Sequence, residues 1–325
     1  MRKSFLIKGT AVMAALFVIG FAFQANDALA AKKAYVSVAT GGTAGTYYPI
    51  GGAIAKAVSS NPAIQATAET GNASVANINL VGAEEIEVAF VQNDISYWAY
   101  TGQLMFDGKA KKNIRAVCAL YPEHVQLIAT KDSGIKGLAD LKGKRVSVGA
   151  PGSGVEGDIQ AIFKMAGLTY DDIKVNFLDF GATTNRFKDE QIDAGFVVAG
   201  YPTASVMDLA LTKDIDLVDF DRDFMKKMQA QYPFLVPSII PAGTYNKIDR
   251  DVQTPAVMAL LVTYENMPED VIYNFTKSLY ENLNLIQNSH AKAKEITLET
   301  ALEGITVPLH PGAAKFFQEK GMQVK

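Results

Sequence analysis

The sequence predicts an α/β fold of two lobes with a cleft between them. From Tyr35 onward, short β-branched runs alternate with longer helical patterns, which is typical of parallel α/β layers. The chain has 325 residues. One hydrophobic core usually serves about 100–200 residues, so we expect two lobes. Midway along the chain, the runs Ile114–Leu120 and Val125–Thr130 follow each other with no helix between them, which indicates a crossover from one lobe to the other.

The first lobe begins with strands and helices in alternation. Apolar and β-branched runs bounded by polar residues predict each strand, and longer amphipathic patterns predict each helix. In chain order we expect strand Tyr35–Ala39, helix Tyr48–Ser59, strand Ile64–Glu69, helix Ser74–Ala83, strand Glu87–Gln92 and a helix from Asp94.

A second α/β unit follows the crossover with the same alternation. We expect a short helix Leu138–Leu141, strand Arg145–Gly149, helix Val155–Ala166, strand Ile173–Leu178, a helix near Thr183–Lys188, strand Ala194–Val198, helix Ala204–Leu211, strand Ile215–Val218 and helix Arg222–Ala230.

The remaining chain returns to the first lobe. It predicts a proline-punctuated segment Leu235–Ala242, strand Val257–Thr263, the long helix Glu269–Gln287 and an amphipathic tail helix Ala313–Gly321. We therefore assign residues 31–124 and 240–325 to lobe one and residues 125–239 to an inserted lobe two. Two chain crossings make a natural hinge.

Residues 1–30 have the three parts of a secretory signal peptide. Arg2, Lys3 and Lys8 supply the positive start, and the charge-free apolar segment Ala11–Phe23 follows. The small residues before position 31 predict cleavage near Ala30 and a periplasmic location. The alternative is a membrane anchor, but 13 apolar residues are fewer than the ~20 that span a bilayer.

Composition excludes several function classes. The net charge is −3, and removal of residues 1–30 leaves −5, without basic runs, which argues against nucleic acid or an anionic membrane as partner. Cys118 is the only cysteine and lies in an apolar run, so we expect a buried thiol rather than a nucleophile. Three scattered histidines do not indicate a metal centre.

Polar segments stand at the carboxyl ends of predicted strands, where open α/β sheets hold ligands. The first is the Gly- and Thr-rich segment 40–49, whose backbone N–H groups and hydroxyls precede a helix and favour an anion. A helix-capping loop without a ligand remains an equal alternative. The candidate ligand-binding residues in this segment are Gly42, Thr43, Gly45, Thr46 and Tyr47.

The next two segments supply polar side chains. Gln92 and Asn93 end a strand and offer both donors and acceptors to a ligand, whereas Asp94 is better interpreted as a helix cap. Glu123 and His124 lie in the crossover. An acid–base pair is one interpretation of them, but no nucleophile or third orienting group accompanies them, so we interpret Glu123 as a polar group of the cleft.

The fourth segment, residues 149–157, opens a helix after a strand and forms a second anion cradle in lobe two. Its candidate residues are Gly152, Ser153, Gly154 and Val155. The segment also matches GxGxxG, and Asp179 follows at the spacing of a dinucleotide fingerprint. Three observations argue against dinucleotide binding: the secretory signal, the lack of hydride-transfer residues and the matching cradle in lobe one. We therefore expect no cofactor.

Together these segments resemble the solute receptors of TAXI-type TRAP transporters over nearly all of the mature chain. The motifs that carry the resemblance are Ala39–Pro49, Phe90–Ile95, Leu120–Glu123, Gly143–Gly154 and Gly200–Pro202. The resemblance implies a periplasmic-binding-protein-like fold of type II, in which two lobes close on one ligand. It also implies that Tyr201 and Pro202 complete the ligand-binding wall.

The resemblance further implies paired membrane subunits that move solute with a sodium gradient, and ligands such as glutamate, glutamine or a dicarboxylate such as 2-oxoglutarate. We expect a monomer that does not itself span the membrane. Val155 departs from the Thr that is frequent in the family, and the only arginines near the predicted cleft, Arg115 and Arg186, lie outside the motifs. Backbone and hydroxyl donors must then hold an anion, which leaves room for a neutral ligand.

Two functions compete at this stage. The first is a binding receptor that is not an enzyme. The alternative is a secreted enzyme on the same scaffold that uses Glu123 and His124.

Overall fold

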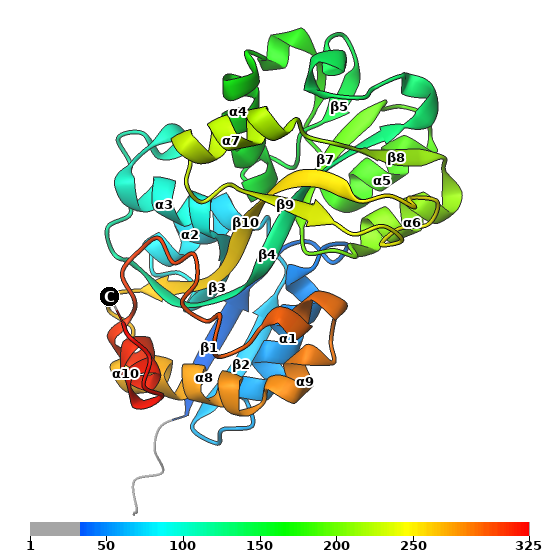
Figure 1. Ribbon diagram of the computed structural model, residues 1–325. Coiled ribbons are helices and arrows are strands. Elements are labelled where there is room, and N and C mark those ends of the chain that lie inside the picture. The colour runs from blue at the N-terminus through cyan, green and yellow to red at the C-terminus, as the bar shows by residue number, and fades with distance from the viewer. Residues whose placement is uncertain (1–32, 325) are drawn as a thin grey trace, which may run out of the picture.

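One ten-stranded mixed sheet runs through both lobes in the computed structural model, which describes residues 33–324 (Figure 1). The strand order is β2-β1-β3-β10-β4-β7-β5-β6, with β8 paired to β4 and β9 paired to β10. The expected signal peptide lies outside the described residues.

The strands differ widely in length. In chain order they are β1 (Ala34–Ala39), β2 (Ile64–Glu69), β3 (Val88–Gln92), β4 (Ile114–Thr130), β5 (Arg145–Ser147), β6 (Lys174–Asn176), β7 (Ala194–Ala199), β8 (Ile215–Val218), β9 (Val236–Ile240) and β10 (Val252–Tyr264).

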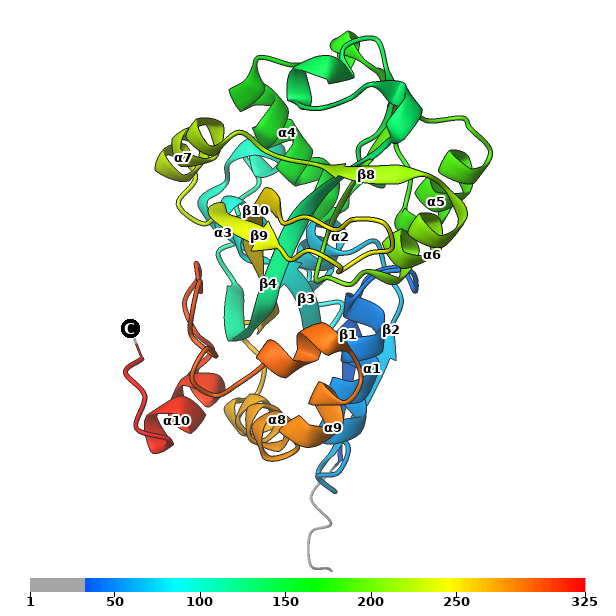
Figure 2. The same ribbon diagram turned by 45° about the vertical axis from the view of Figure 1, so that its right-hand side comes forward.

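The helices cover both faces of the sheet (Figures 1 and 2). They are α1 (Tyr47–Val58), α2 (Ser74–Gly82), α3 (Asn93–Thr101), α4 (Gly154–Ala166), α5 (Phe180–Lys188), α6 (Ala204–Thr212), α7 (Arg222–Gln231), α8 (Glu269–Glu281), α9 (Leu283–Gln287) and α10 (Pro311–Glu319).

The two longest strands join the lobes. β4 and β10 are antiparallel to each other from Ile114 opposite Tyr264 to His124 opposite Ala256. β10 continues lobe one by pairing with β3, whereas the second half of β4 pairs with β7 and β8 of lobe two. The sheet therefore changes lobes along these two strands. The lobe boundaries at 124 and 239 remain a prediction.

Three apolar clusters hold these layers together. One lies under α1, α8 and α10 on one face of the lobe-one strands, and another lies under α5 and α6 of lobe two. The third cluster is shared between the lobes, because it joins side chains of α2 and α3 to those of α4 and α7. Cys118 belongs to the first cluster and is fully buried, as predicted.

Three predicted elements differ from the structure. The runs Ile114–Leu120 and Val125–Thr130 form one strand, because pairing with β10 keeps the residues between them extended. The proline-punctuated segment Leu235–Ala242 contains strand β9, which pairs only along β10. The helix predicted over Glu269–Gln287 breaks at Asn282, whose side-chain amide donates to the Ser278 carbonyl at 2.8 Å.

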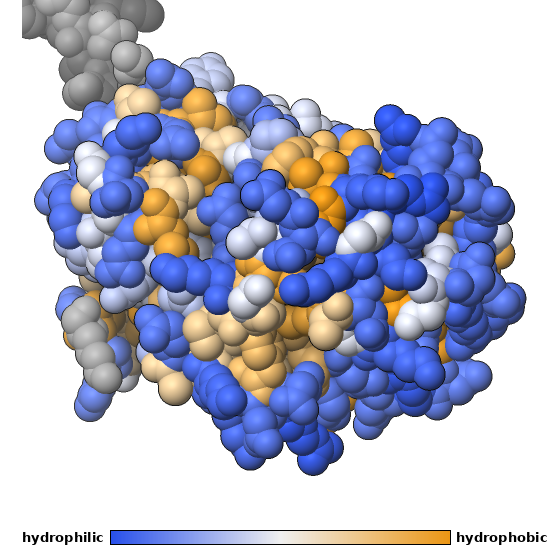
Figure 3. Space-filling model, turned by 90° about the horizontal axis from the view of Figure 1, so that it is seen from above, coloured by the Kyte–Doolittle hydropathy of each residue, from blue (hydrophilic) through white to orange (hydrophobic). Residues whose placement is uncertain are grey.

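The surface shows few large apolar side chains. Figure 3 shows mostly hydrophilic residues on the face seen from above, with apolar residues gathered in small patches. Within residues 33–324, no helix has the length and apolar character that a membrane span requires.

We expect Phe275→Ala to lower the free energy of unfolding by about 3–5 kcal/mol, because it empties a packed position. Phe275 is a fully buried residue on the inner face of α8. Tyr35→Ala is the matched control, since the Tyr35 side chain is 75% exposed. Urea denaturation followed by circular dichroism compares the two variants, and equal losses would contradict this account of the core.

Candidate functional site

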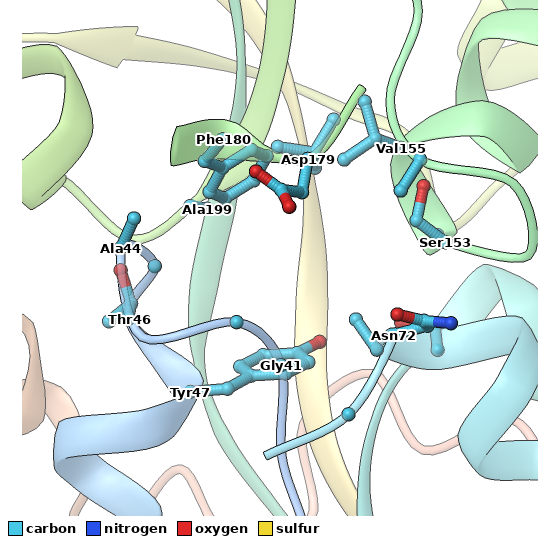
Figure 4. Close-up of a pocket in the computed structure, with 18 of the residues that line it drawn as sticks. Gly41, Ala44, Thr46, Tyr47, Asn72, Ser153, Val155, Asp179, Phe180 and Ala199 are labelled. Atoms are coloured by element: carbon cyan, nitrogen blue, oxygen red, sulfur yellow. The ribbon is translucent and has the colours of Figure 1, made fainter. Parts of the chain in front are cut away.

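A cavity of about 470 Å³ lies between the lobes (Figure 4). Lobe one contributes the loops that precede α1 and α2, and lobe two contributes the start of α4, the start of α5 and the end of β7. Ten of the predicted ligand-binding residues line this cavity. They are Gly42, Thr43, Gly45, Thr46, Tyr47, Gln92, Glu123, Ser153, Gly154 and Val155.

Four predicted residues do not line this cavity. Asn93 lines a second cavity, where its amide donates to the Gly304 carbonyl at 3.0 Å. Gly152 turns the chain into α4 with φ 75°. Tyr201 and Pro202 pack against the segment 290–292.

Sequence reasoning missed lining residues in three places, one of which is the end of β7 at Val198 and Ala199. Residues 70–74 follow β2, and residues 179–181 begin α5. Both segments follow predicted strands. The rule that open α/β sheets hold ligands at the carboxyl ends of their strands therefore applied to them as well. Figure 4 shows the Asp179 carboxyl group pointing into the cavity from lobe two, with Asn72 and Tyr47 on the opposite wall. Asp179 also caps α5 by accepting from Ala182 N at 2.7 Å.

Of the four helix starts that border the cavity, those of α1 and α4 lie in the two predicted anion cradles. α1 begins after the Gly-rich loop, and α4 begins after Ser153, whose Oγ accepts from Glu156 N at 3.2 Å. Among the described residues, the N–H groups of Gly42, Thr43 and Val155 have no hydrogen-bond acceptor. Free N–H groups at helix starts attract negative charge, so both walls favour an anionic group.

The lobes touch on both sides of the cavity. Thr46 Oγ1 donates to the Gly200 carbonyl at 2.8 Å, so this hydroxyl is committed to the opposite lobe. Ala76 N donates to the Gly152 carbonyl at 3.0 Å. These contacts indicate that the structure is a closed state.

The closest contact between the lobes requires a glycine. A Cβ atom on Gly154 would lie 1.4 Å from Gln92 Oε1 and 2.8 Å from Ser74 Oγ. Gln92 is itself held in place, because its Nε2 donates to Asp158 Oδ2 at 2.7 Å. Gly154 therefore lets the start of α4 approach the end of β3.

A buried pair of carboxyl groups joins the lobes beside this contact. Asp94 of α3 and Asp158 of α4 are fully buried, and each acts on the pKa of the other. Asp94 Oδ2 and Asp158 Oδ1 have no hydrogen-bond partner in residues 33–324. Burial raises the pKa of both groups, and the negative field of Asp94 further raises the pKa of Asp158.

Glu123 and His124 point in opposite directions, because successive residues of a strand alternate faces. Glu123 accepts a hydrogen bond from the Tyr47 hydroxyl at 2.6 Å inside the cavity. His124 Nε2 lies 2.9 Å from Ser238 Oγ, and burial lowers the pKa of His124 to about 3. The two side chains therefore do not form the acid–base pair of the enzyme hypothesis.

The cavity wall carries carboxyl groups but no cationic side chain. Glu123 and Asp179 line it, and no Lys, Arg or His does. Arg115 pairs with Glu265 at 2.6 Å, and Arg186 lies on α5; neither lines the cavity. No group of three or more His, Cys, Asp or Glu suited to a metal occurs within the described residues. The polar groups that the described lining offers are therefore hydrogen-bonding side chains, carboxyl groups and the N–H groups of helix starts.

The family assignment covers most of the chain. The model of the NMT1-like family matches residues 38–321. The chain belongs to the NMT1-like family. This match includes every residue that lines the cavity.

Solved structures share the fold at low sequence identity. A protein from Bordetella bronchiseptica RB50 aligns with a TM-score of 0.57 and 15% identity, over 90% of this chain and 99% of that chain. The binding protein component of an ABC phosphonate transporter from Pseudomonas aeruginosa aligns with a TM-score of 0.52 and 13% identity, over 82% of this chain and 80% of that chain. The predicted fold class, an α/β periplasmic-binding-protein-like fold of type II, is confirmed.

We expect Gly154→Ala to weaken binding of any solute held in the closed cleft by tenfold or more, because the added methyl group overlaps the Gln92 side chain. Gly137→Ala is the matched control, since nothing lies within 4 Å of its Cβ position. Calorimetric titration measures the affinity, and small-angle scattering measures closure. Unchanged closure in Gly154→Ala would contradict the proposed contact.

We expect the free energy of unfolding to fall as the pH rises from about 7 to about 8, above the range in which histidine side chains release their protons in the unfolded chain. Burial raises the pKa of Glu123 to about 8. In that interval the folded chain holds protons that the unfolded chain has released, so rising pH favours unfolding. Asp158→Asn keeps an acceptor for Gln92 and gains a donor for Asp94. It should therefore make the free energy of unfolding depend less steeply on pH.

The measurement is urea denaturation at several pH values. Asp249→Asn is the control, because that side chain is exposed and should leave the slope unchanged. A stability that rises over this interval in the wild type would contradict the protonated state of these carboxyl groups.

Proposed function

We propose that this protein is a periplasmic solute receptor of a TAXI-type TRAP transporter, and that it is not an enzyme. The observation that carries the proposal is the closed cavity of about 470 Å³ with walls from both lobes. Ligand pockets of small molecules usually measure about 300–1,000 Å³. Lobe closure around a solute gives a transporter one surface by which to recognise the loaded state.

The chemistry of the walls supports a small organic anion or an amino acid. The helix N-termini of α1 and α4 suit a carboxylate, and the Asp179 carboxylate suits an ammonium group. Glutamate and glutamine carry both groups, and 2-oxoglutarate carries two carboxylates. An amino acid therefore uses more of the site than a dicarboxylate does.

The apolar part of the wall limits the size of the solute. Val155, Phe180, Val198 and Ala199 close the lobe-two side. These side chains exclude water around the polar contacts, which strengthens hydrogen bonds to a charged solute. The resemblance to TAXI-type receptors implies the membrane subunits as partners. The predicted signal peptide, residues 1–30, directs export to the periplasm.

Relatives with this fold suggest other solutes for the test. The Pseudomonas aeruginosa neighbour is named as a component of a phosphonate transporter. A phosphonate is a tetrahedral anion, and helix N-termini hold such groups as well as carboxylates. A phosphonate therefore belongs in the panel of candidate solutes.

We expect native mass spectrometry of the purified mature chain to reveal a retained small solute. Titration with L-glutamate, L-glutamine, 2-oxoglutarate and a small phosphonate should then give a saturable change in the fluorescence of Trp98, the only tryptophan. Trp98 lies edge-on to Phe234 at 5.5 Å in the cluster shared between the lobes, so it reports their closure.

Recovery of the solute unchanged after incubation would support the receptor. Conversion of the solute would favour the secreted enzyme and would contradict the proposal. A Gly154→Ala sample serves as the control, because its lobes should not close on the solute.

A further inference from the structure

The Glu123 side chain combines deep burial with an unused oxygen atom. It is 2% exposed, and it lines the cavity from β4. Its Oε2 atom accepts the hydrogen bond from Tyr47. Within residues 33–324, Oε1 makes no hydrogen bond, and the side chain that carries it borders the cavity. A solute in the cavity therefore meets Oε1.

No cation neutralises this carboxyl group by contact. Within residues 33–324, the positive charge that acts on Glu123 is that of Lys292, whose Nζ pairs with Glu295 at 2.8 Å and lies 4.1 Å from the centre of the Tyr201 ring. Lys292 acts on Glu123 only through its field. The Lys292 ammonium group instead contacts Glu295 and the Tyr201 ring.

The remaining ionisable groups that act on Glu123 oppose its negative charge. Tyr121 precedes it on β4 and carries no positive charge. Asp94 of α3 and Asp158 of α4 interact with it through the field of their buried carboxyl groups. Burial, the main cause, raises the pKa of Glu123 to about 8, so the group carries a proton at neutral pH.

The hydrogen bond from Tyr47 decides which oxygen carries the proton. Burial raises the pKa of Tyr47 well above its ordinary value, so the hydroxyl group stays protonated. It donates a hydrogen bond to Glu123 Oε2. The Glu123 proton then belongs on Oε1, where an O–H group has no acceptor among the described residues. Because Glu123 lines the cavity, a solute oxygen placed there can accept this hydrogen bond.

We propose that Glu123 binds the solute as an uncharged carboxylic acid, whose Oε1–H donates a hydrogen bond to an anionic oxygen of the solute. This inference rests on the proposed receptor function. Glu123 thereby selects solutes that carry an anionic oxygen at this end of the cavity, while Asp179 remains free for a positive group at the other wall.

The proposal predicts the sign of the pH dependence of binding. Above pH 8 the free protein loses the proton, and binding an anion must first recover it. Affinity for an anion should fall by up to tenfold for each unit above pH 8. A solute ammonium group at the same oxygen would produce the opposite trend, because it prefers the carboxylate.

The experiment titrates the mature chain with 2-oxoglutarate and with L-glutamate between pH 6 and pH 9.5. 2-Oxoglutarate has no ammonium group, so its charge stays constant over this range. At pH 8 the wild type should take up a fraction of a proton on binding, which calorimetry detects as a heat that depends on the ionisation enthalpy of the buffer.

Variants separate this role from a structural one. Glu123→Ala should weaken binding by tenfold or more, and Glu123→Gln, which keeps a donor and an acceptor, should restore much of the affinity without proton uptake or the fall above pH 8. Asp179→Asn removes the other lining carboxylate, and the fall above pH 8 should persist. Circular dichroism confirms that each variant folds.

Three outcomes decide the matter. Loss of affinity above pH 8 in the wild type and its absence in Glu123→Gln would support the proposal. A flat or rising profile in the wild type would overturn this inference and leave the receptor function standing. Failure of every probe to bind at any pH would overturn the proposed function and this inference with it.

Discussion

The pairing of β4 with β10 is the constraint on which the rest of the structure depends. These strands are the central pair of a sheet that continues into both lobes, so they determine how the lobes face each other. They also determine which side chains enter the cleft. Since alternate residues of β4 face opposite sides, Glu123 points into the cavity and His124 points toward β9.

The contacts across the cleft near α4 all bury polar groups at the start of this helix. Gly154 brings the helix close to Gln92, and this approach places Asp158 against Asp94 away from water. Buried carboxyl groups are tolerated when they are protonated and hydrogen-bonded. Burial raises the pKa of Asp94, Asp158 and Glu123 in the closed state, which reduces the negative charge near a cavity whose described lining has no cationic side chain.

The predicted ligand-binding residues line the observed cavity where they lie in loops that follow strands. The Gly-rich loop before α1 and the start of α4 line one cavity from opposite lobes. Asn93 points elsewhere because its amide and carbonyl are used by Gly304 and Met258. Local sequence reveals that a polar residue ends a strand, but its hydrogen-bond partners are distant in the chain.

By itself, the sequence determined the alternation of strands and helices, the two loops rich in free N–H groups and the fold class, because these follow from local periodicity, glycine content and short motifs. Only the tertiary structure decided that residues 114–130 form one strand, that Thr46 bonds to the opposite lobe, and that Glu123 sits between Tyr47 and the cavity. Each of these depends on partners far along the chain. The protonation of a carboxyl group depends on its burial, which no short segment of sequence specifies.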